Sequence, residues 1–206
     1  MIGLVDYGSG NIQAIANIYS RLSLPSFIAR TAADLALATH VVLPGVGAFD
    51  QTMEHLEASG LRDALTERVV GQGTPFLGIC VGMQLLAARS EEGTRPGLGW
   101  IDAEVRRFDH ARFTQRTHVP HMGWNDVELV RPHPLFAGLE RDASFYFLHS
   151  YYVDCARRDD VLAEADYGGP FACAVHAGNI HGVQFHPEKS HQGGIRLLKN
   201  FAELRC

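Results

Sequence analysis

A cysteine between two glycines is the first feature of the sequence that could carry out chemistry. The segment Gly78-Ile79-Cys80-Val81-Gly82 follows a short apolar run and precedes apolar residues at helical spacing. A glycine–x–nucleophile–x–glycine turn between a strand and a helix exposes its central side chain above the sheet. A helix that begins after the cysteine would favour an anion there, and therefore the reactive thiolate. A buried structural cysteine in a tight turn would fit the same pattern, so the interpretation depends on a partner residue.

A histidine and a glutamate near the C-terminus supply such a partner. The sequence reads Phe185-His186-Pro187-Glu188, and the proline biases the histidine towards an extended backbone. In an extended chain, alternate side chains point the same way. Glu188 is therefore expected to accept a hydrogen bond from His186, which leaves the other ring nitrogen free to face a thiol. Cys80, His186 and Glu188 together predict a nucleophile, a base and an orienting carboxylate.

A glycine-rich segment, Pro44-Gly45-Val46-Gly47, follows another apolar run. Backbone N–H groups in such a segment can turn towards a nucleophile, as an oxyanion hole requires, and the N–H of Val81 would be the second donor. We therefore predict an oxyanion site at Gly47 and Val81. An ordinary glycine-rich loop is the alternative, but the spacing is not that of a dinucleotide-binding loop, and we predict no cofactor.

Four histidines recur every five residues, at His176, His181, His186 and His191. On a strand, an odd offset places side chains on opposite faces, so His181 and His186 are expected to point apart. No cysteine or carboxylate pattern completes a zinc site around them. The sequence therefore predicts no metal site.

Strand and helix patterns alternate in the first half of the chain. Strands are predicted at residues 2–8, 40–43 and 75–79, with helices at 11–22, from residue 50, within 53–73 and after Cys80. This order predicts an α/β fold with a mostly parallel, helix-covered sheet that carries the nucleophile elbow. Later β-rich segments, 101–108, 124–130, 144–154, 171–178 and 180–187, predict a mixed or antiparallel portion, and 193–204 a last helix. We find no linker or repeat and predict one domain, residues 1–206.

The composition argues against several classes of protein. The 206 residues are 46% hydrophobic and 20% charged, with a formal net charge of −5, which does not favour a nucleic-acid surface. No stretch approaches the about 20 apolar residues of a membrane span, and the N-terminal segment lacks the basic start of a signal peptide. The four cysteines show no Cys-x-x-Cys spacing. These features predict a cytoplasmic protein that does not bind membranes or nucleic acid.

The motifs "PGVG", "GICVGMQ" and "FHPE", in this order, resemble the class I (triad-type) glutamine amidotransferases. Within this family, "VDYGSGN", "LPGVGAF", "PHMGWN", "FYFLHSY" and "GVQFHPEKS" resemble the glutaminase subunits of imidazole glycerol phosphate synthases. The resemblance covers residues 2–204. It implies that Cys80 attacks the side-chain amide of L-glutamine, with His186 as base and then acid, Glu188 as its orienter, and Gly47 and Val81 holding the oxyanion. It further implies that glutamine is bound by Gln84, Glu92, Ser150 and Tyr151.

The resemblance also implies a partner, a (βα)8-barrel cyclase subunit that uses the ammonia in histidine biosynthesis. Trp124, Tyr146 and Lys189 resemble its interface residues. Segments 90–100 and 162–172 and residue His191 leave open a paralogue that supplies ammonia to a surface-polysaccharide sugar amidotransferase. A non-catalytic subunit, or a cysteine-elbow peptidase or chaperone, is the alternative of another class. The complete Cys80/His186/Glu188 set argues against it, as does valine at position 81, where such peptidases often carry histidine.

Overall fold

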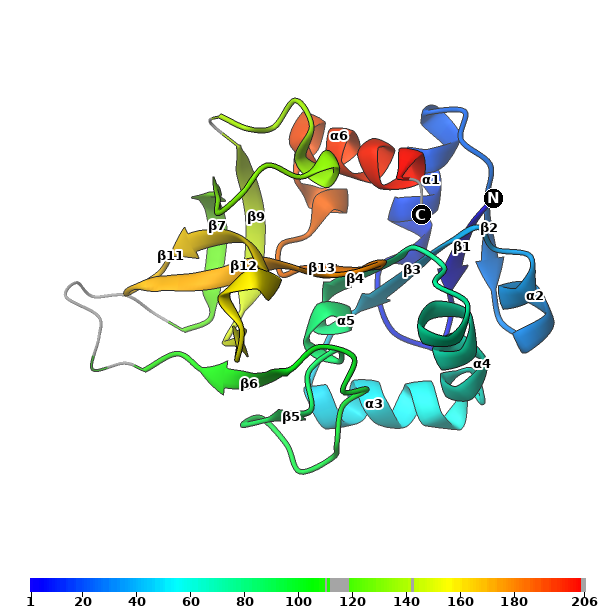
Figure 1. The fold of residues 1–206 in the computed structure, drawn as a ribbon, viewed down its shortest axis with the longest axis horizontal. Coiled ribbons are helices and arrows are strands. Elements are labelled where there is room, and N and C mark those ends of the chain that lie inside the picture. The colour runs from blue at the N-terminus through cyan, green and yellow to red at the C-terminus, as the bar shows by residue number, and fades with distance from the viewer. Residues whose placement is uncertain (110, 112–118, 142, 205–206) are drawn as a thin grey trace.

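The computed structural model describes residues 1–109, 111, 119–141 and 143–204. Within them, an eleven-stranded sheet has the order β2-β1-β3-β4-β13-β12-β10-β6-β5, with β11 joining β12 to β8, and a separate two-stranded sheet pairs β7 with β9 (Figure 1). The strands are β1 Ile2–Val5, β2 Ser26–Ala29, β3 His40–Gly45, β4 Phe76–Cys80, β5 Arg89–Ser90, β6 Ala103–Arg107, β7 His121–Asp126, β8 Glu128–Leu129, β9 Ser144–His149, β10 Tyr151–Cys155, β11 Val161–Asp166, β12 Pro170–Ala177 and β13 Ile180–Val183.

Helices cover both faces of the parallel half of the sheet. Strands β2, β1, β3, β4 and β13 are parallel neighbours. Figure 1 shows α1 and α6 on one side of these strands and α3 and α4 on the other. The helices are α1 Ile12–Arg21, α2 Ala32–Ala36, α3 Phe49–Ala58, α4 Arg62–Thr66, α5 Val81–Gln84 and α6 His191–Glu203, with single turns η1 Glu67–Gly71, η3 Pro134–Phe136, η4 Arg158–Asp160 and η5 Pro187–Lys189.

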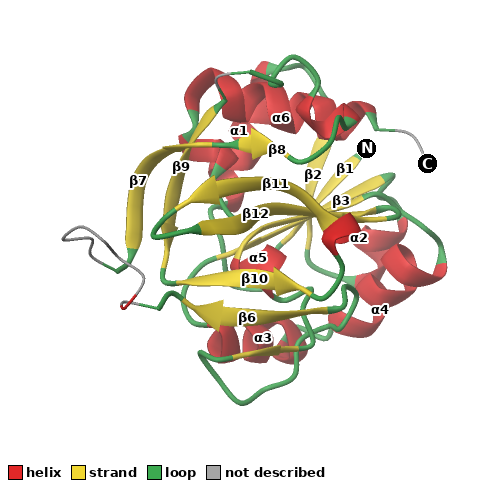
Figure 2. Ribbon diagram, turned by 60° about the vertical axis from the view of Figure 1, so that its left-hand side comes forward, coloured by secondary structure: helices red, strands yellow, loops and turns green. Residues whose placement is uncertain are grey.

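The other half of the main sheet is largely antiparallel. Strand β12 pairs antiparallel with β13, β10 and β11. Strand β10 also pairs antiparallel with β6 (Figure 2). The predicted α/β fold, a parallel helix-covered sheet with a mixed portion, is therefore confirmed. Of the helices in the described residues, none is long and apolar enough to cross a membrane.

Several local expectations differ from the structure. The helix after Cys80 has only the four residues of α5, because the chain turns at Leu85 to reach the short strand β5. The segment 144–154 forms two strands, β9 and β10, which belong to different sheets and meet at a bend at Ser150. Strands β2 and β11 were not expected. Strand β3 extends through Gly45, which lies opposite Cys80 on β4.

Candidate active site

Cys80 ends strand β4 in a backbone conformation that L-residues rarely adopt, with φ 56° and ψ −114°. Glycine is required around it because the backbones of the turn and of β3 approach closely. A Cβ at Gly82 would lie 2.0 Å from the Leu43 carbonyl oxygen, and one at Gly78 would lie 2.5 Å from the Gly82 carbonyl oxygen. The strained backbone therefore forms the predicted elbow. The helix that follows is a single turn, so it contributes less to stabilising an anion than a full helix would.

His186 and Glu188 form a buried pair, as their spacing suggested. The Nδ1–H of His186 donates to Glu188 Oε1 at 2.9 Å, and the two side chains are only 4% and 2% exposed. Because Nδ1 is bonded to Glu188, Nε2 is the ring nitrogen that remains for proton transfer. Burial alone would lower the pKa of His186, but its interactions with Cys80 and Glu188 outweigh burial and raise it to about 10. The imidazole is therefore suited to hold a proton at neutral pH.

The backbone that brings Glu188 to His186 differs from the sequence expectation. His186 itself is extended, but residues 187–189 form the 3-10 turn η5 rather than a continuing strand. The Ser190 hydroxyl donates to the His186 carbonyl at 2.6 Å and accepts the Tyr146 N–H at 3.0 Å. This serine therefore ties the histidine segment to β9.

Gln184 is a buried neighbour of the thiol that the sequence analysis did not single out. Its Nε2 donates to Cys80 Sγ at 3.7 Å, and its Oε1 accepts from Gln84 Nε2 at 3.0 Å. Gln84 Nε2 also donates to the Tyr151 carbonyl oxygen at 3.1 Å. The sequence did contain a signal for Gln184. It directly follows the apolar strand β13 and lies two residues before His186, so in extended backbone its side chain would lie on the same side as that of His186.

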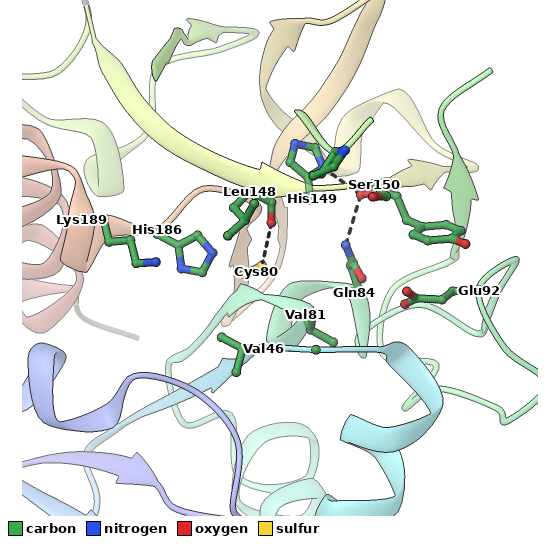
Figure 3. A pocket seen from close by; sticks show the side chains of 13 residues that line it. Val46, Cys80, Val81, Gln84, Glu92, Leu148, His149, Ser150, His186 and Lys189 are labelled. Atoms are coloured by element: carbon green, nitrogen blue, oxygen red, sulfur yellow. Dashed lines mark hydrogen bonds between the residues drawn. The ribbon is translucent and has the colours of Figure 1, made fainter. Parts of the chain in front are cut away.

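A cavity of about 270 Å³ opens over Cys80 (Figure 3). The predicted residues that line it are Gly47, Cys80, Val81, Gln84, Glu92, Ser150, Tyr151, His186 and Lys189; Val46, Pro120, Leu148 and His149 complete the lining. Figure 3 shows His186 and Lys189 on one side of Cys80, and Gln84 and Glu92 on the other. Two predicted residues, Trp124 and Tyr146, are not part of the lining, and Glu188 lies behind His186.

The glycine-rich segment beside the cavity is held by a serine from the β1–α1 loop. Ser9 Oγ lies 3.0 Å from both the N–H and the carbonyl oxygen of Val46, so it accepts from the first and donates to the second. Gly47 has φ 98°, a conformation that favours glycine. The Val46 carbonyl belongs to the same peptide group as the Gly47 N–H, so its bond from Ser9 constrains the orientation of the predicted oxyanion donor.

Glu92 lies at the far end of the cavity from His186 (Figure 3). One of its oxygens, Oε2, accepts the Phe49 N–H at the start of α3 at 2.8 Å. The carboxylate is therefore positioned by a helix N-terminus while it lines the cavity.

The predicted interface residues lie at the rim, on and beside the sheet of β7 and β9. Trp124 is 49% exposed and stacks on His191, with ring centroids 5.1 Å apart. The Lys189 Nζ lies 5.7 Å from the centroid of the Tyr146 ring. Met122 and Leu148, which the sequence analysis did not single out, are also exposed, at 64% and 37%. Together these residues form what we call the apolar rim, four apolar or aromatic side chains with one lysine at its edge: Met122, Trp124, Tyr146, Leu148 and Lys189.

Two of the histidines in the five-residue repeat belong to a cluster that the sequence did not predict. His176 and His181 lie directly opposite each other on β12 and β13, and His133 joins them so that one ring nitrogen of each lies within 4.8 Å of the others. The offset expected to separate side chains was considered for His181 and His186 on one strand, whereas His176 and His181 lie on two strands that the turn between β12 and β13 brings together. His181 Nδ1 lies 3.2 Å from the Phe76 carbonyl oxygen.

The hydrogen bonds of this histidine cluster do not present three free nitrogens. His133 Nδ1 accepts the Leu135 N–H at 3.1 Å, and His176 Nδ1 accepts from Arg131 at 3.1 Å. Both neutral rings therefore carry their proton on Nε2. A cation bound at Nε2 of these two rings would displace that hydrogen, and a neutral ring would then carry it on Nδ1. Nδ1 could no longer accept, so both hydrogen bonds would be lost. The guanidinium of Arg131 also places a positive charge beside the cluster, which disfavours a second cation.

Comparisons with known proteins show the family of the chain. The family model for glutamine amidotransferase class-I matches residues 3–204. The chain is 55% identical over 204 residues to the imidazole glycerol phosphate synthase subunit HisH of Bdellovibrio bacteriovorus, covering 99% of this chain and 100% of that one. It is 50% identical to the protein of the same name from Leptospira interrogans, at the same coverage.

Solved structures of lower identity share the fold. The crystal structure of a glutamine amidotransferase superposes with a TM-score of 0.70 at 20% identity, covering 98% of this chain and 99% of that one. A chain of PurLQS from Thermotoga maritima gives 0.70 at 15% identity, covering 98% and 97%. On its full-length match to the family model and to the relatives above, the chain belongs to the class I glutamine amidotransferase family.

Proposed function

We propose that this chain is the glutaminase subunit of an imidazole glycerol phosphate synthase. It hydrolyses L-glutamine to glutamate and ammonia. The observation that carries the proposal is the elbow cysteine at the base of a cavity whose wall includes His186, which is itself bonded to the buried Glu188. Relatives at 55% and 50% identity over the whole chain bear the name of this subunit.

The reaction follows from the positions of the side chains. Cys80 Sγ attacks the amide carbon of glutamine, and the negative charge that develops on the oxygen is held by the N–H groups of Gly47 and Val81. The carbon–nitrogen bond breaks as His186 gives its proton to the leaving ammonia. A water molecule, deprotonated by His186, then attacks the thioester, and the carbon–sulfur bond breaks to release glutamate. Glu188 keeps the ring of His186 oriented in both steps.

The amino-acid end of glutamine would occupy the part of the cavity away from His186. Glu92 would take the ammonium group, and the backbone of Ser150 and Tyr151 the carboxylate. Gln84 would help to bind the same end of the substrate, since its side chain already donates to the Tyr151 carbonyl beside that part of the cavity. These assignments are supported by the position of all four residues along the lining.

The partner would be the cyclase subunit, docked on the apolar rim. Exposed aromatic and methionine side chains are typical of the centre of protein interfaces, and this rim borders the cavity from which ammonia would leave. The bond from Ser9 to the Val46 carbonyl would keep the isolated chain slow if rotation of the Val46–Gly47 peptide is needed to turn the Gly47 N–H towards the oxyanion. A reducing cytoplasm fits the requirement for a free thiol at Cys80.

The test is glutamine hydrolysis by the purified chain, alone and together with the acceptor ligand and the cyclase subunit. We expect slow turnover alone and an increase of orders of magnitude with both present. Absence of turnover in every combination would contradict the proposal. Stimulation by a surface-polysaccharide barrel partner, without stimulation by the cyclase, would assign the chain to the paralogous pathway instead.

Labelling by a glutamine-like electrophile gives a second test. We expect Cys80 to be modified in preference to Cys155, because burial, together with nearby carboxylates, raises the pKa of the Cys155 thiol to about 12. Peptide mapping by mass spectrometry measures the distribution. Equal labelling of the two residues would contradict the assignment of Cys80 as the nucleophile.

A further inference from the structure

Two buried histidines are not used by the reaction above, although one of them, His149, is part of the cavity lining. His121 on β7 and His149 on β9 are cross-strand neighbours and are 3% and 6% exposed. His121 Nδ1 lies 2.9 Å from His149 Nε2, and His149 Nδ1 lies 2.8 Å from the Tyr151 carbonyl oxygen. Both rings are packed among aromatic side chains.

These hydrogen bonds form a series, and the direction of each is fixed by the groups at the two ends, the Tyr151 carbonyl and the Asn125 side-chain amide. A carbonyl oxygen only accepts, so His149 Nδ1 carries the hydrogen and His149 Nε2 accepts from His121 Nδ1–H. His121 Nε2 must then accept, and its neighbour at 3.3 Å is the amide nitrogen of Asn125, which only donates. The Asn125 orientation is set independently, because its Oδ1 accepts the Asp126 N–H and its Nδ2 donates to the Asp166 carbonyl oxygen.

Neutral rings are required for this arrangement, and the surroundings keep them neutral. Burial is the main cause that lowers the pKa of His149 to about 3 and of His121 to about 4. The bonds therefore keep one direction at all pH values at which the protein would work.

The last hydrogen bond of the series reaches Tyr151, which lines the cavity proposed to bind glutamine. The Tyr151 carbonyl oxygen accepts both His149 Nδ1–H and Gln84 Nε2–H, and Figure 3 shows the two bonds meeting beside Ser150. The bond from His149 spans the bend at which the chain leaves β9 for β10. It therefore fixes the backbone of residues 149–151, where the cavity lining changes from one sheet to the other.

We propose that the ordered hydrogen bonds from Asn125 through His121 and His149 to Tyr151 position the backbone that binds the carboxylate of the substrate. His121 and His149 are positioning residues, because their hydrogen bonds run to each other and to the Tyr151 carbonyl, and they serve recognition of the amino-acid end of glutamine. This inference rests on the proposed function. It predicts that breaking the chain of bonds weakens glutamine binding and leaves the reactivity of the thiol unchanged.

The test is His121→Phe, measured in the complex with the cyclase subunit. Phenylalanine keeps an aromatic ring against Phe147 but leaves His149 Nε2 without its donor. We expect the KM for glutamine to rise about tenfold, the loss of about 1.4 kcal/mol for one hydrogen bond to a buried group, with kcat changed less than threefold. The rate at which iodoacetamide alkylates Cys80 should stay unchanged. His121→Gln, which offers an amide donor in place of the ring N–H, should restore part of the KM.

The matched control is Phe171→Leu. Its ring packs on both histidines, with centroids 5.8 and 5.2 Å away, without being part of the chain of bonds. It should lower stability and leave KM unchanged. A KM that rises equally in His121→Phe and Phe171→Leu, or in neither, would overturn the proposal.

A measurement without substrate separates this inference from the proposed function. Long-range ¹H–¹⁵N NMR spectra of the isolated chain report which nitrogen of each histidine carries hydrogen. We expect both His121 and His149 as the Nδ1–H form. The Nε2–H form of His149 would overturn the proposed series of hydrogen bonds from Asn125 to Tyr151, even if glutamine hydrolysis is found. If wild type shows no hydrolysis, the proposed function fails whatever the tautomers.

Discussion

The base and the rim of the cavity are held in different ways. At the base, Cys80 is 4% exposed and its position follows from close backbone approaches between β3, β4 and α5. At the rim, Met122 and Trp124 are 64% and 49% exposed and rest on a sheet of only two strands. At the base, the side chains of this chain bury one another, whereas at the rim apolar side chains remain exposed to solvent. Exposed apolar surface of this kind marks sites of interaction, so the proposed partner would dock on the rim without supplying the residues at the base.

Removing the nucleophile should give the largest effect and concern the base alone. Cys80→Ala should lower glutamine turnover by about 10⁶-fold, as loss of a nucleophile does in other enzymes. Ammonia-dependent synthesis by the complex should be retained, because the rim is untouched. Steady-state assays with each nitrogen source measure this. Cys155→Ala is the control and should keep glutamine turnover; turnover surviving in Cys80→Ala would show that another group attacks.

Removing the charge behind His186 should give the next largest effect. Glu188→Gln should lower turnover by about 10³–10⁴-fold, the cost seen when an orienting carboxylate is replaced by an amide. It should also remove one of the two interactions that hold the pKa of His186 at about 10. An NMR titration of the His186 ring should show a lower pKa in the variant. An unchanged value would mean that Glu188 does not stabilise the imidazolium.

The same substitution has a pH-dependent effect on stability. A folded-state pKa of about 10 lies above the usual value of 6.5, so the stabilisation of charged His186 is complete below about pH 6.5. It is lost as the pH rises through about 10. The destabilisation by Glu188→Gln should therefore be largest near pH 6 and shrink towards pH 10. Urea unfolding at several pH values measures it, and a pH-independent difference would contradict the linkage.

Adding a methyl group to the elbow tests how the backbone holds the base. Gly82→Ala places a Cβ 2.0 Å from the Leu43 carbonyl oxygen, and we expect a loss of about 3 kcal/mol or more in the free energy of unfolding. Gly60→Ala is the control, since φ is 72° there but nothing lies within 4 Å. It should cost only about 1–2 kcal/mol for the left-handed backbone. Equal losses in urea unfolding would show that close approach does not matter.

Truncating the rim should give the smallest effect on the chain itself and a selective effect on the complex. Trp124→Ala should weaken binding to the cyclase subunit by about 2 kcal/mol, roughly 30-fold in Kd, with the isolated chain's slow turnover unchanged. Titration calorimetry measures the affinity. Leu37→Ala, at another exposed apolar residue, 61% exposed on the C-cap of α2, is the control. An equal change in both variants would remove the rim as the docking surface.

Most of the base was predictable because its constraints are local. The glycines around Cys80, the strand before it and the pairing of His186 with Glu188 are all properties of short segments. The sequence likewise predicted the alternation of strands and helices in the parallel half, since buried strands and amphipathic helices have distinct periods. Even here one detail differs, because η5 and not an extended strand brings Glu188 to His186.

The rest depended on contacts between distant segments, which the sequence does not display. One β-rich segment, 144–154, became two strands in two sheets because the bend at Ser150 is closed by a bond from His149 to Tyr151. The pairing of His121 with His149, of His176 with His181, and of Gln184 with Cys80 arises only when the strands are set side by side. Residue types and local spacing determined the chemistry, whereas tertiary packing decided which polar groups orient it and which apolar residues stay exposed.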